Sequence, residues 1–155
     1  MSDITNEISA EGKAEAEREL AELRDEKRPA IVAAIKAARE EGDLSENAEY
    51  HAAREEQGHL ESRIRTLESL LAHAEVTEAP PGDEVGVGSR VSFRDVASGE
   101  EQNVTVVHRL EASIAEGKLS AESPIAQALL GGSKGETVRF ETPGGVKEFE
   151  ILDVG

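Results

Sequence analysis

The sequence has no cysteine and no tryptophan, and its only phenylalanine and tyrosine residues are Tyr50, Phe93, Phe140 and Phe149. Without cysteine the chain can form neither disulfides nor thiolate metal sites. So few aromatic side chains suit helix seams and a small sheet better than one large globular core. No apolar run approaches the ~18 residues of a membrane span, and the first residues lack the basic and apolar regions of a signal peptide. We therefore expect a cytoplasmic protein without a membrane partner.

Basic residues are also scarce. The chain has 33 Asp and Glu against 17 Lys and Arg, which gives a formal net charge of −16. Both halves are acidic, with 20 acids against 10 bases in residues 1–80 and 13 against 7 in residues 81–155. Because phosphate binding needs clustered cations, this charge argues against a module that binds free nucleic acid by itself. It leaves open a protein that works on nucleic acid inside a basic partner.

The first half has the residue spacing of two helices. Mostly apolar positions between residues 50 and 74 follow one another at alternating steps of three and four, a heptad seam. The seam consists of Tyr50, Ala53, Gln57, Leu60, Ile64, Leu67, Leu71 and Ala74. This pattern predicts a helix from about Glu46 to Ala74. Residues 11–41 have a similar but less regular spacing, and Pro29 predicts a kink or break near Arg28.

A short segment, Glu-Gly-Asp-Leu-Ser at residues 41–45, separates these two helices. Gly42 suits the left-handed position that follows a helix. So short a connection makes the helices antiparallel neighbours. We therefore predict an N-terminal antiparallel coiled-coil hairpin over residues 1–78, with an arm about 45 Å long and an acidic tip at residues 41–49.

The second half, residues 79–155, has a different pattern after the linker signal Ala-Pro-Pro-Gly-Asp at 79–83. Short β-rich runs separated by glycine-containing turns predict strands, the last two joined as a hairpin by a turn at 142–145. These runs are residues 90–93, 103–107, 137–140 and 147–152. Ser123 and Pro124 predict the N-cap and first residue of a short helix. The whole chain is therefore predicted to be α+β, with a small α+β domain after the hairpin.

The predicted tip, residues 39–50, holds five carboxylates and one arginine. Helix C-termini prefer cations, so Glu40 and Glu41 each cost about 0.3–1 kcal/mol there, which hints at function. Asp43 and Glu46 also fit a capping box, with Asp43 as N-cap and Glu46 three residues later. The residues alone leave both interpretations open. Since Mg²⁺ takes only one or two carboxylates from any one donor, two tip acids can share a metal with another protein.

Residues 39–58, Arg-Glu-Glu-Gly-Asp-Leu-Ser-Glu-Asn-Ala-Glu-Tyr-His-Ala-Ala-Arg-Glu-Glu-Gln-Gly, resemble the signature of the GreA/GreB transcription elongation factors. Further matches follow in the family's order over almost the whole chain. They lie at residues 8–12, 28–31, 63–64, 74–76, 123–131 and 142–145. The low basic content of the hairpin makes the GreA type the better match.

This resemblance implies a factor that binds bacterial RNA polymerase and stimulates its intrinsic cleavage activity, not an enzyme of its own. The C-terminal domain would have an FKBP-like fold and dock at the rim of the secondary channel, with Ser123 and Pro124 in its docking signature. The coiled coil would enter the channel. Asp43 and Glu46 match the family's acids that hold a Mg²⁺ shared with the polymerase, so that the RNA 3′ end of a backtracked complex is cleaved.

Four more residues, Arg39, Asn47, Tyr50 and Arg54, are candidates for contact with RNA or the channel. Two of them, Arg39 and Arg54, match family positions that face the nascent RNA or the channel wall. For Arg39 and Arg54, solvated pairing along the helix, such as Arg39 with Asp43, is an equal alternative worth ~0.3–0.5 kcal/mol. Tyr50 is expected to pack between the helices, with a second role at the active centre. Asn47 is expected to cap or brace the tip loop. The four histidines lack metal-site spacing and are expected on the surface or in the seam, and the free protein is expected to be a monomer.

Other functions share some of these features. A prolyl isomerase would line its pocket with aromatic side chains, but the three phenylalanines fall in predicted strands, where they fill a small core. A coiled-coil adaptor would use the tip only as a turn. A polymerase inhibitor without cleavage activity would share every docking feature and differ at the tip. The Asp-Leu-Ser-Glu order at residues 43–46 resembles the cleavage-competent form.

Overall fold

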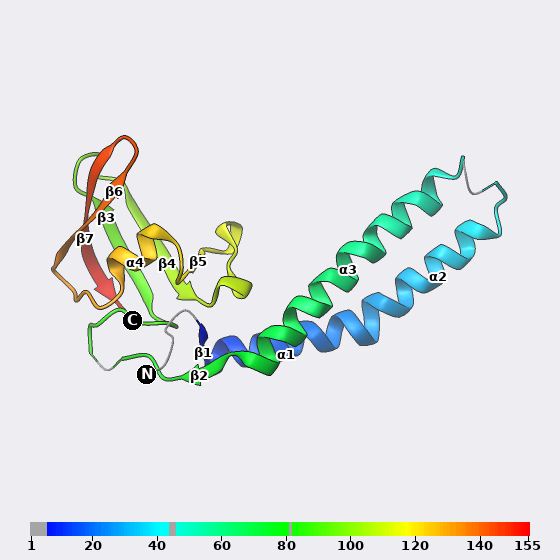
Figure 1. Ribbon diagram of the computed structural model, residues 1–155, viewed down its shortest axis with the longest axis horizontal. Helices are drawn as coiled ribbons and strands as arrows, with labels where there is room; N and C mark the ends of the chain where they lie inside the picture. The colour runs from blue at the N-terminus through cyan, green and yellow to red at the C-terminus, as the bar shows by residue number, and fades with distance from the viewer. Residues whose placement is uncertain (1–5, 44–45, 81) are drawn as a thin grey trace. The chain divides into compact units, whose positions relative to one another are not determined.

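The computed structural model describes residues 6–43, 46–80 and 82–155 (Figure 1). Its contacts divide the chain into two compact units. Residues 14–73 form the hairpin unit, and the N-terminal residues through Lys13 form the sheet unit together with residues 74–155. The division therefore does not follow chain order, because the first described residues belong with the C-terminal ones. No helix in the described part of the chain is long and apolar enough to cross a membrane.

The hairpin unit is built from helices that run out to the tip and back, as Figure 1 shows. Its segments are α1 (Ala10–Glu22, which begins in the sheet unit), the π-helix η2 (Leu23–Lys27), α2 (Arg28–Arg39) and α3 (Ala48–His73). The predicted antiparallel hairpin is confirmed, with the second helix starting two residues later than expected.

The predicted interruption near Pro29 is a π-helical turn. Proline has no backbone N–H and its ring crowds the preceding turn, so the regular hydrogen-bond ladder cannot pass through it unchanged. The N–H of Arg28 donates to the carbonyl of Leu23, five residues back, and α2 starts at Arg28 with Pro29 in its first turn. The chain thus stays helical through the irregularity and does not break.

The apolar seam joins the two sides of the hairpin. Leu60, Ile64 and Leu67 are buried as predicted, but the next buried position is Leu70, whereas Leu71 is half-buried. An α-helix has 3.6 residues per turn, so a strict heptad pattern drifts around a straight helix and a neighbouring position takes over. On the opposing side of the hairpin the buried residues are Ala16, Leu20, Ile31, Ile35 and Ala38.

Three ion pairs link the helices beside this seam. Arg24 pairs with Glu68 at 3.0 Å, Arg28 with Glu61 at 2.7 Å and Arg63 with Glu19 at 2.7 Å. Two of them are bidentate, with both carboxylate oxygens accepting from the guanidinium. The arginines at 28 and 63, which belong to family landmarks in the sequence, therefore clamp one side of the hairpin to the other.

The Arg28–Glu61 pair has the clearest electrostatic effect. The hydrogen bond from Arg28 lowers the pKa of the Glu61 carboxyl below its ordinary value, and Glu61 in turn raises the pKa of Arg28. Both side chains are partly open to solvent. The pair therefore fixes how the two helices face each other but contributes little to the free energy of unfolding.

The sheet unit contains a five-stranded mixed sheet in the order β5-β4-β3-β7-β6, with only the β4–β5 pair parallel. Its strands are β3 (Arg90–Asp95), β4 (Glu101–Val107), β5 (Lys118–Ser120), β6 (Thr137–Thr142) and β7 (Gly145–Val154). The four predicted strands and the β6–β7 hairpin are confirmed. A separate parallel pair, β1 (Glu7–Ser9) with β2 (Glu75–Thr77), was not predicted, and neither was β5.

The core of the sheet unit uses the chain's phenylalanines. The rings of Phe93 and Phe149 meet edge to face and those of Phe140 and Phe149 stack, each pair with centroids 5.1 Å apart. Helix α4 (Pro124–Leu129) buries Leu129 in the same core. Because the aromatic rings pack on one another, they do not line a pocket of the prolyl-isomerase kind. The α+β prediction is confirmed.

Candidate functional site

The tip begins where α2 ends. The N–H of Glu40 donates to the carbonyl of Lys36, and that of Glu41 to the carbonyl of Ala38, both at 3.2 Å. Gly42 follows with φ of 126°, a backbone conformation that favours glycine. This glycine turns the chain out of the helix, as the sequence predicted, and opens the loop that carries the acidic residues.

Asn47 closes the loop by binding both helices. Its Oδ1 accepts from the Tyr50 N–H at 3.0 Å, which caps α3, and its Nδ2 donates to the Ala38 carbonyl at 2.6 Å, in the last turn of α2. One side chain therefore satisfies a donor at one helix start and an acceptor at the other helix end. The prediction that Asn47 caps or braces the tip is confirmed.

The capping box, one of the two interpretations left open for Asp43 and Glu46, does not start α3. Helix α3 begins at Ala48, so both acids precede the cap residue Asn47. Asp and Asn are equally good N-caps, but the sequence pattern favoured Asp43, because Glu46 lies three residues after it whereas Tyr50 lies three residues after Asn47. Leu44 and Ser45 of the same motif lie outside the described residues.

Asp43 and Glu46 are both exposed at the tip. The Glu46 N–H lies 3.4 Å from the Asp43 carbonyl, so a turn brings the two backbones together. Their carboxylates are hard oxygen ligands of the kind that Mg²⁺ takes. Among residues 6–43, 46–80 and 82–155 no three His, Asp or Glu side chains gather as a metal site. The two tip carboxylates therefore match Mg²⁺ in ligand type but are too few for a complete site.

Arg39 and Tyr50 meet across the tip. The Arg39 guanidinium lies over the Tyr50 ring, 5.8 Å from its centroid, a cation–π contact between the end of α2 and the start of α3. Tyr50 is half-buried, which fits its predicted place at the end of the seam, and its ring also touches His51 edge to face. Arg54 lies one turn further along α3, where it donates to Gln57 at 3.2 Å. The structure thus brings Arg39, Asn47 and Tyr50 together, whereas the hydrogen bond of Arg54 is to Gln57, further along α3.

The two predicted docking residues, Ser123 and Pro124, lie in the sheet unit. The Ser123 hydroxyl donates to the Ser120 carbonyl at 2.7 Å and accepts from the Ala126 N–H at 3.3 Å. It is the N-cap of α4, and Pro124 is the first residue of that helix and is exposed. The capping prediction is confirmed, and docking stays a prediction.

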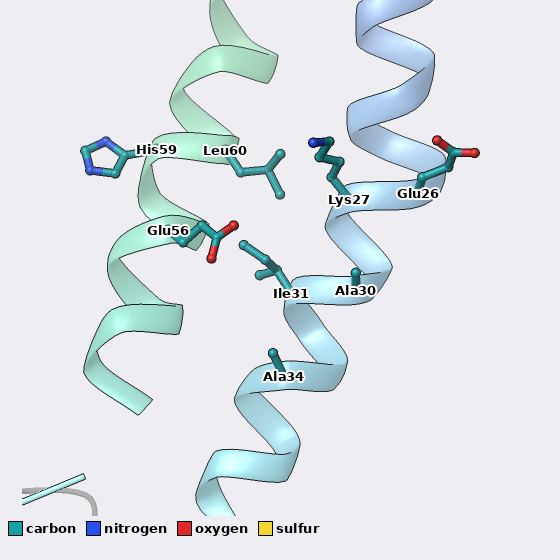
Figure 2. A pocket seen from close by; sticks show the side chains of 8 residues that line it. All are labelled: Glu26, Lys27, Ala30, Ile31, Ala34, Glu56, His59 and Leu60. Atoms are coloured by element: carbon teal, nitrogen blue, oxygen red, sulfur yellow. The ribbon is translucent and has the colours of Figure 1, made fainter. Parts of the chain in front are cut away.

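A surface groove of about 610 Å³ lies further along the hairpin, between α2 and α3 (Figure 2). Its floor is apolar, with Ile31, Ala34 and Leu60. Among its charged or titratable neighbours, His59 points away from the floor whereas Glu56 points toward Ile31, as Figure 2 shows. These side chains do not converge on one point, so the groove offers no arrangement for chemistry.

His108 does not fit its prediction, because it is neither on the surface nor in the seam. It is 2% exposed within the sheet unit, where its Nδ1 accepts from the Leu110 N–H at 3.1 Å and its Nε2 lies 3.2 Å from the Asn6 Oδ1. Burial, with Arg109 nearby, lowers the pKa of its imidazole. The bond to Leu110 is local, but the partner Asn6 lies 102 residues earlier in the chain, and no local sequence signal marks that contact.

Comparisons with known proteins cover both units. Residues 6–76 match the family model for the N-terminal part of GreA/GreB transcription elongation factors, and residues 80–155 match the model for the C-terminal part. Transcription elongation factor GreA of Anaeromyxobacter sp. (strain K) is 49% identical over 138 residues, 88% of this chain and 83% of its own. The GreA of Thioalkalivibrio sulfidiphilus (strain HL-EbGR7) is 45% identical over 150 residues, 95% of each chain.

A solved structure matches as well. The crystal structure of Thermus aquaticus Gfh1 is 32% identical and covers 96% of each chain, with a TM-score of 0.45. The two family models together span nearly all of the described residues, and the GreA relatives match over most of their own length. The chain therefore belongs to the GreA/GreB family of transcription elongation factors.

Proposed function

We propose that this protein binds bacterial RNA polymerase through its secondary channel and stimulates cleavage of the RNA 3′ end in backtracked complexes. The observation that carries the proposal is the tip itself. Asp43 and Glu46 are exposed in a short loop whose base Asn47 fixes to both helices. An acidic loop with a fixed base, on a member of this family, is suited to bring ligands into a partner's active centre.

The hairpin unit would act as the arm that carries the tip. Helix α3 has 26 residues, which corresponds to a length of about 39 Å. The buried seam and the three ion pairs hold its two sides in one register. A stiff arm keeps the tip acids in place, and misplacement of a catalytic group by 1 Å can cost about 100-fold in rate.

Asp43 and Glu46 would share a Mg²⁺ with the polymerase. When bound, this metal supplies a water of lowered pKa and stabilises the leaving oxygen of phosphodiester hydrolysis. Asp43 would contribute most to holding the metal through its carboxylate. Glu46 would either support that ligation or orient the attacking water by accepting its hydrogen bond. The rest of the active centre and the RNA belong to the polymerase, so this chain would be a cofactor of the reaction and not a separate nuclease.

The residues next to the tip acids would contact the RNA or the wall of the polymerase channel. Arg39 stacks on Tyr50 and so presents its charge in a fixed place beside the acids. Arg54 lies one turn after Tyr50 in α3, where it bonds Gln57. Asn47 fixes the base of the loop through its bond to the Ala38 carbonyl. Ser123 and Pro124, at the start of α4, would take part in docking the sheet unit at the channel rim.

The test is RNA cleavage by a purified backtracked elongation complex with the wild type and with Asp43→Asn/Glu46→Gln. The wild type is expected to release short 3′ fragments in a Mg²⁺-dependent way. The double variant is expected to lose about 100-fold or more of this stimulation, because several kcal/mol of transition-state stabilisation disappear with the ligands. Polymerase binding should persist. Glu40→Gln/Glu41→Gln removes the same charge from two other exposed residues of the tip and should retain most activity.

Other outcomes assign a different function or remove this one. A wild type that binds the complex but leaves the RNA intact or blocks elongation is an inhibitor. Equal losses in both double variants would show that tip charge acts, and not the specific pair. Absence of polymerase binding would refute the proposed function altogether.

A further inference from the structure

Ile114 is the most exposed large apolar side chain in the part of the chain that the structure describes, at 97%. The others in this class are only about half as exposed, between 45% and 54%. Single surface-exposed apolar residues are common. Ile114 differs in degree, because almost none of its side chain is covered and nearly all of its apolar area is available to a partner.

The loop that displays Ile114 is tightly hydrogen-bonded. Ser113 and Lys118 exchange two backbone hydrogen bonds, at 3.0 and 2.9 Å, which close the loop at its base. Between them lie the 3₁₀ turn η4 (Ile114–Glu116) and Gly117, with φ of 70°, whose N–H donates to the Ile114 carbonyl at 3.1 Å. The side chain is therefore presented by a pre-formed turn, and little backbone freedom would be lost on binding.

The loop is also anchored to the interior of the sheet unit. The preceding turn, η3 (Arg109–Glu111), is capped by the buried His108, and Arg109 pairs with Glu122 at 3.6 Å. The strand β5 that leaves the loop ends at Ser120, whose carbonyl accepts from the Ser123 hydroxyl. The chain thus runs from Ile114 through the rest of η4 and the strand β5 to Ser123 and Pro124, the residues expected to dock on the polymerase.

The charge of the chain narrows the choice of partner. A second copy would also carry a net charge of −16, and a nucleic acid or an anionic membrane would be repelled as well. A protein with an apolar pocket and a cationic rim has the complementary chemistry. Binding energy at interfaces concentrates in a few side chains that fill well-packed pockets, and an aliphatic side chain can be such an anchor.

We propose that Ile114 is the anchor residue by which the sheet unit docks on RNA polymerase, inserting into an apolar pocket of the polymerase surface. The inference rests on the proposed function and adds a binding contact that is independent of the tip chemistry. It predicts that loss of the Ile114 side chain weakens binding and leaves fold and tip intact.

The test measures the affinity of the full chain for core RNA polymerase by fluorescence anisotropy. Since the chain has no cysteine, a single cysteine introduced at Glu100, which is exposed, carries the label in every variant. Ile114→Ser is expected to bind about 10- to 100-fold more weakly, which corresponds to losing one buried aliphatic side chain. Its melting temperature should match the wild type because the side chain is exposed. The control is Val146→Ser, which truncates a 54%-exposed apolar residue elsewhere in the sheet unit and should bind like the wild type.

The outcomes separate this inference from the proposed function. If the wild type binds and Ile114→Ser binds equally well, the anchor is refuted while the proposed function stands. If Val146→Ser weakens binding as much as Ile114→Ser, binding depends on exposed apolar area in general, and the specific role of Ile114 is refuted. Sedimentation of the free wild type as an Ile114-dependent dimer would assign the side chain to a second copy instead. A wild type that does not bind polymerase at all removes the proposed function first.

Discussion

The stem and the tip of the hairpin unit use the same residue types in different ways. In the stem, Glu19, Glu61 and Glu68 each lie within 3.0 Å of an arginine on the opposite side of the hairpin. At the tip, Asp43 and Glu46 are exposed and the nearby Arg39 rests on an aromatic ring. An acidic residue in this chain is therefore structural where an arginine faces it across the seam, and is presented outward where the helices end.

This contrast separates stability from activity within a single unit. Substitutions in the stem should lower the free energy of unfolding, whereas substitutions of the tip acids should change cleavage with little effect on the fold. Substitution of Asn47 should affect both properties, because this residue lies at the tip but its side chain bonds the two helices of the stem.

The largest stability effect is expected from Ile64→Ala in the stem. Ile64 is 1% exposed, and removing most of a buried isoleucine costs about 2–5 kcal/mol of unfolding free energy. Guanidinium denaturation followed by far-UV circular dichroism measures it. Val32→Ala, at a 53%-exposed position of α2, is the control and should stay within about 0.5 kcal/mol of the wild type. Equal losses in both variants would mean that the seam does not hold the arm together.

A smaller loss is expected from Asn47→Ala. It removes the cap of α3 and the hydrogen bond to the Ala38 carbonyl, together about 1–2 kcal/mol. Asn47→Asp keeps the acceptor for the Tyr50 N–H but has no donor for Ala38, so its loss should be intermediate. Hydrogen exchange of the Tyr50 amide reports the cap directly. If that amide exchanges at the wild-type rate in Asn47→Ala, the cap does not order the tip.

The smallest effect concerns pH and the Arg28–Glu61 pair. The pKa of Glu61 is lowered in the folded chain, so its ion pair stabilises above the ordinary carboxyl value of 4.5 and is lost as pH falls through the lowered pKa. Glu61→Gln should therefore melt slightly below the wild type at pH 7 and converge with it in acid. The measurement is the difference in melting temperature between the two proteins from pH 7 to pH 3. A constant difference over this range would contradict the pairing.

Much of the fold could be predicted from signals between residues close in the sequence. Ser123 before Pro124 predicted the start of α4, Pro29 predicted an irregularity, and the heptad spacing predicted the arm, because each depends on residues close in the chain. The β1–β2 pair could not be predicted in this way. Its strands have three residues each and pair Glu7 with Glu75, far apart in sequence.

The candidate site was predicted in part for the same reason. The acidic loop and its glycine follow from composition and turn chemistry, and Asn47 was expected to cap or brace. The helix start was misplaced because Asp43 has an acid three residues later and Asn47 does not. The bonds of Asn47 to the Tyr50 N–H and to the Ala38 carbonyl mark the actual start. The burial of His108 depends on tertiary contacts with Asn6, which no short pattern encodes.

The parallel pairing of β1 with β2 makes the hairpin unit an insertion within the sheet unit. The chain enters the arm shortly after Ser9 and returns before Thr77, and these two residues are partners in the same ladder. A change of the hairpin unit by whole heptads, or an exchange of its loop, would alter neither partner of this ladder nor any strand of the five-stranded sheet. The residues of the tip could therefore be replaced to give a different chemistry without any change to the sequence of the sheet unit.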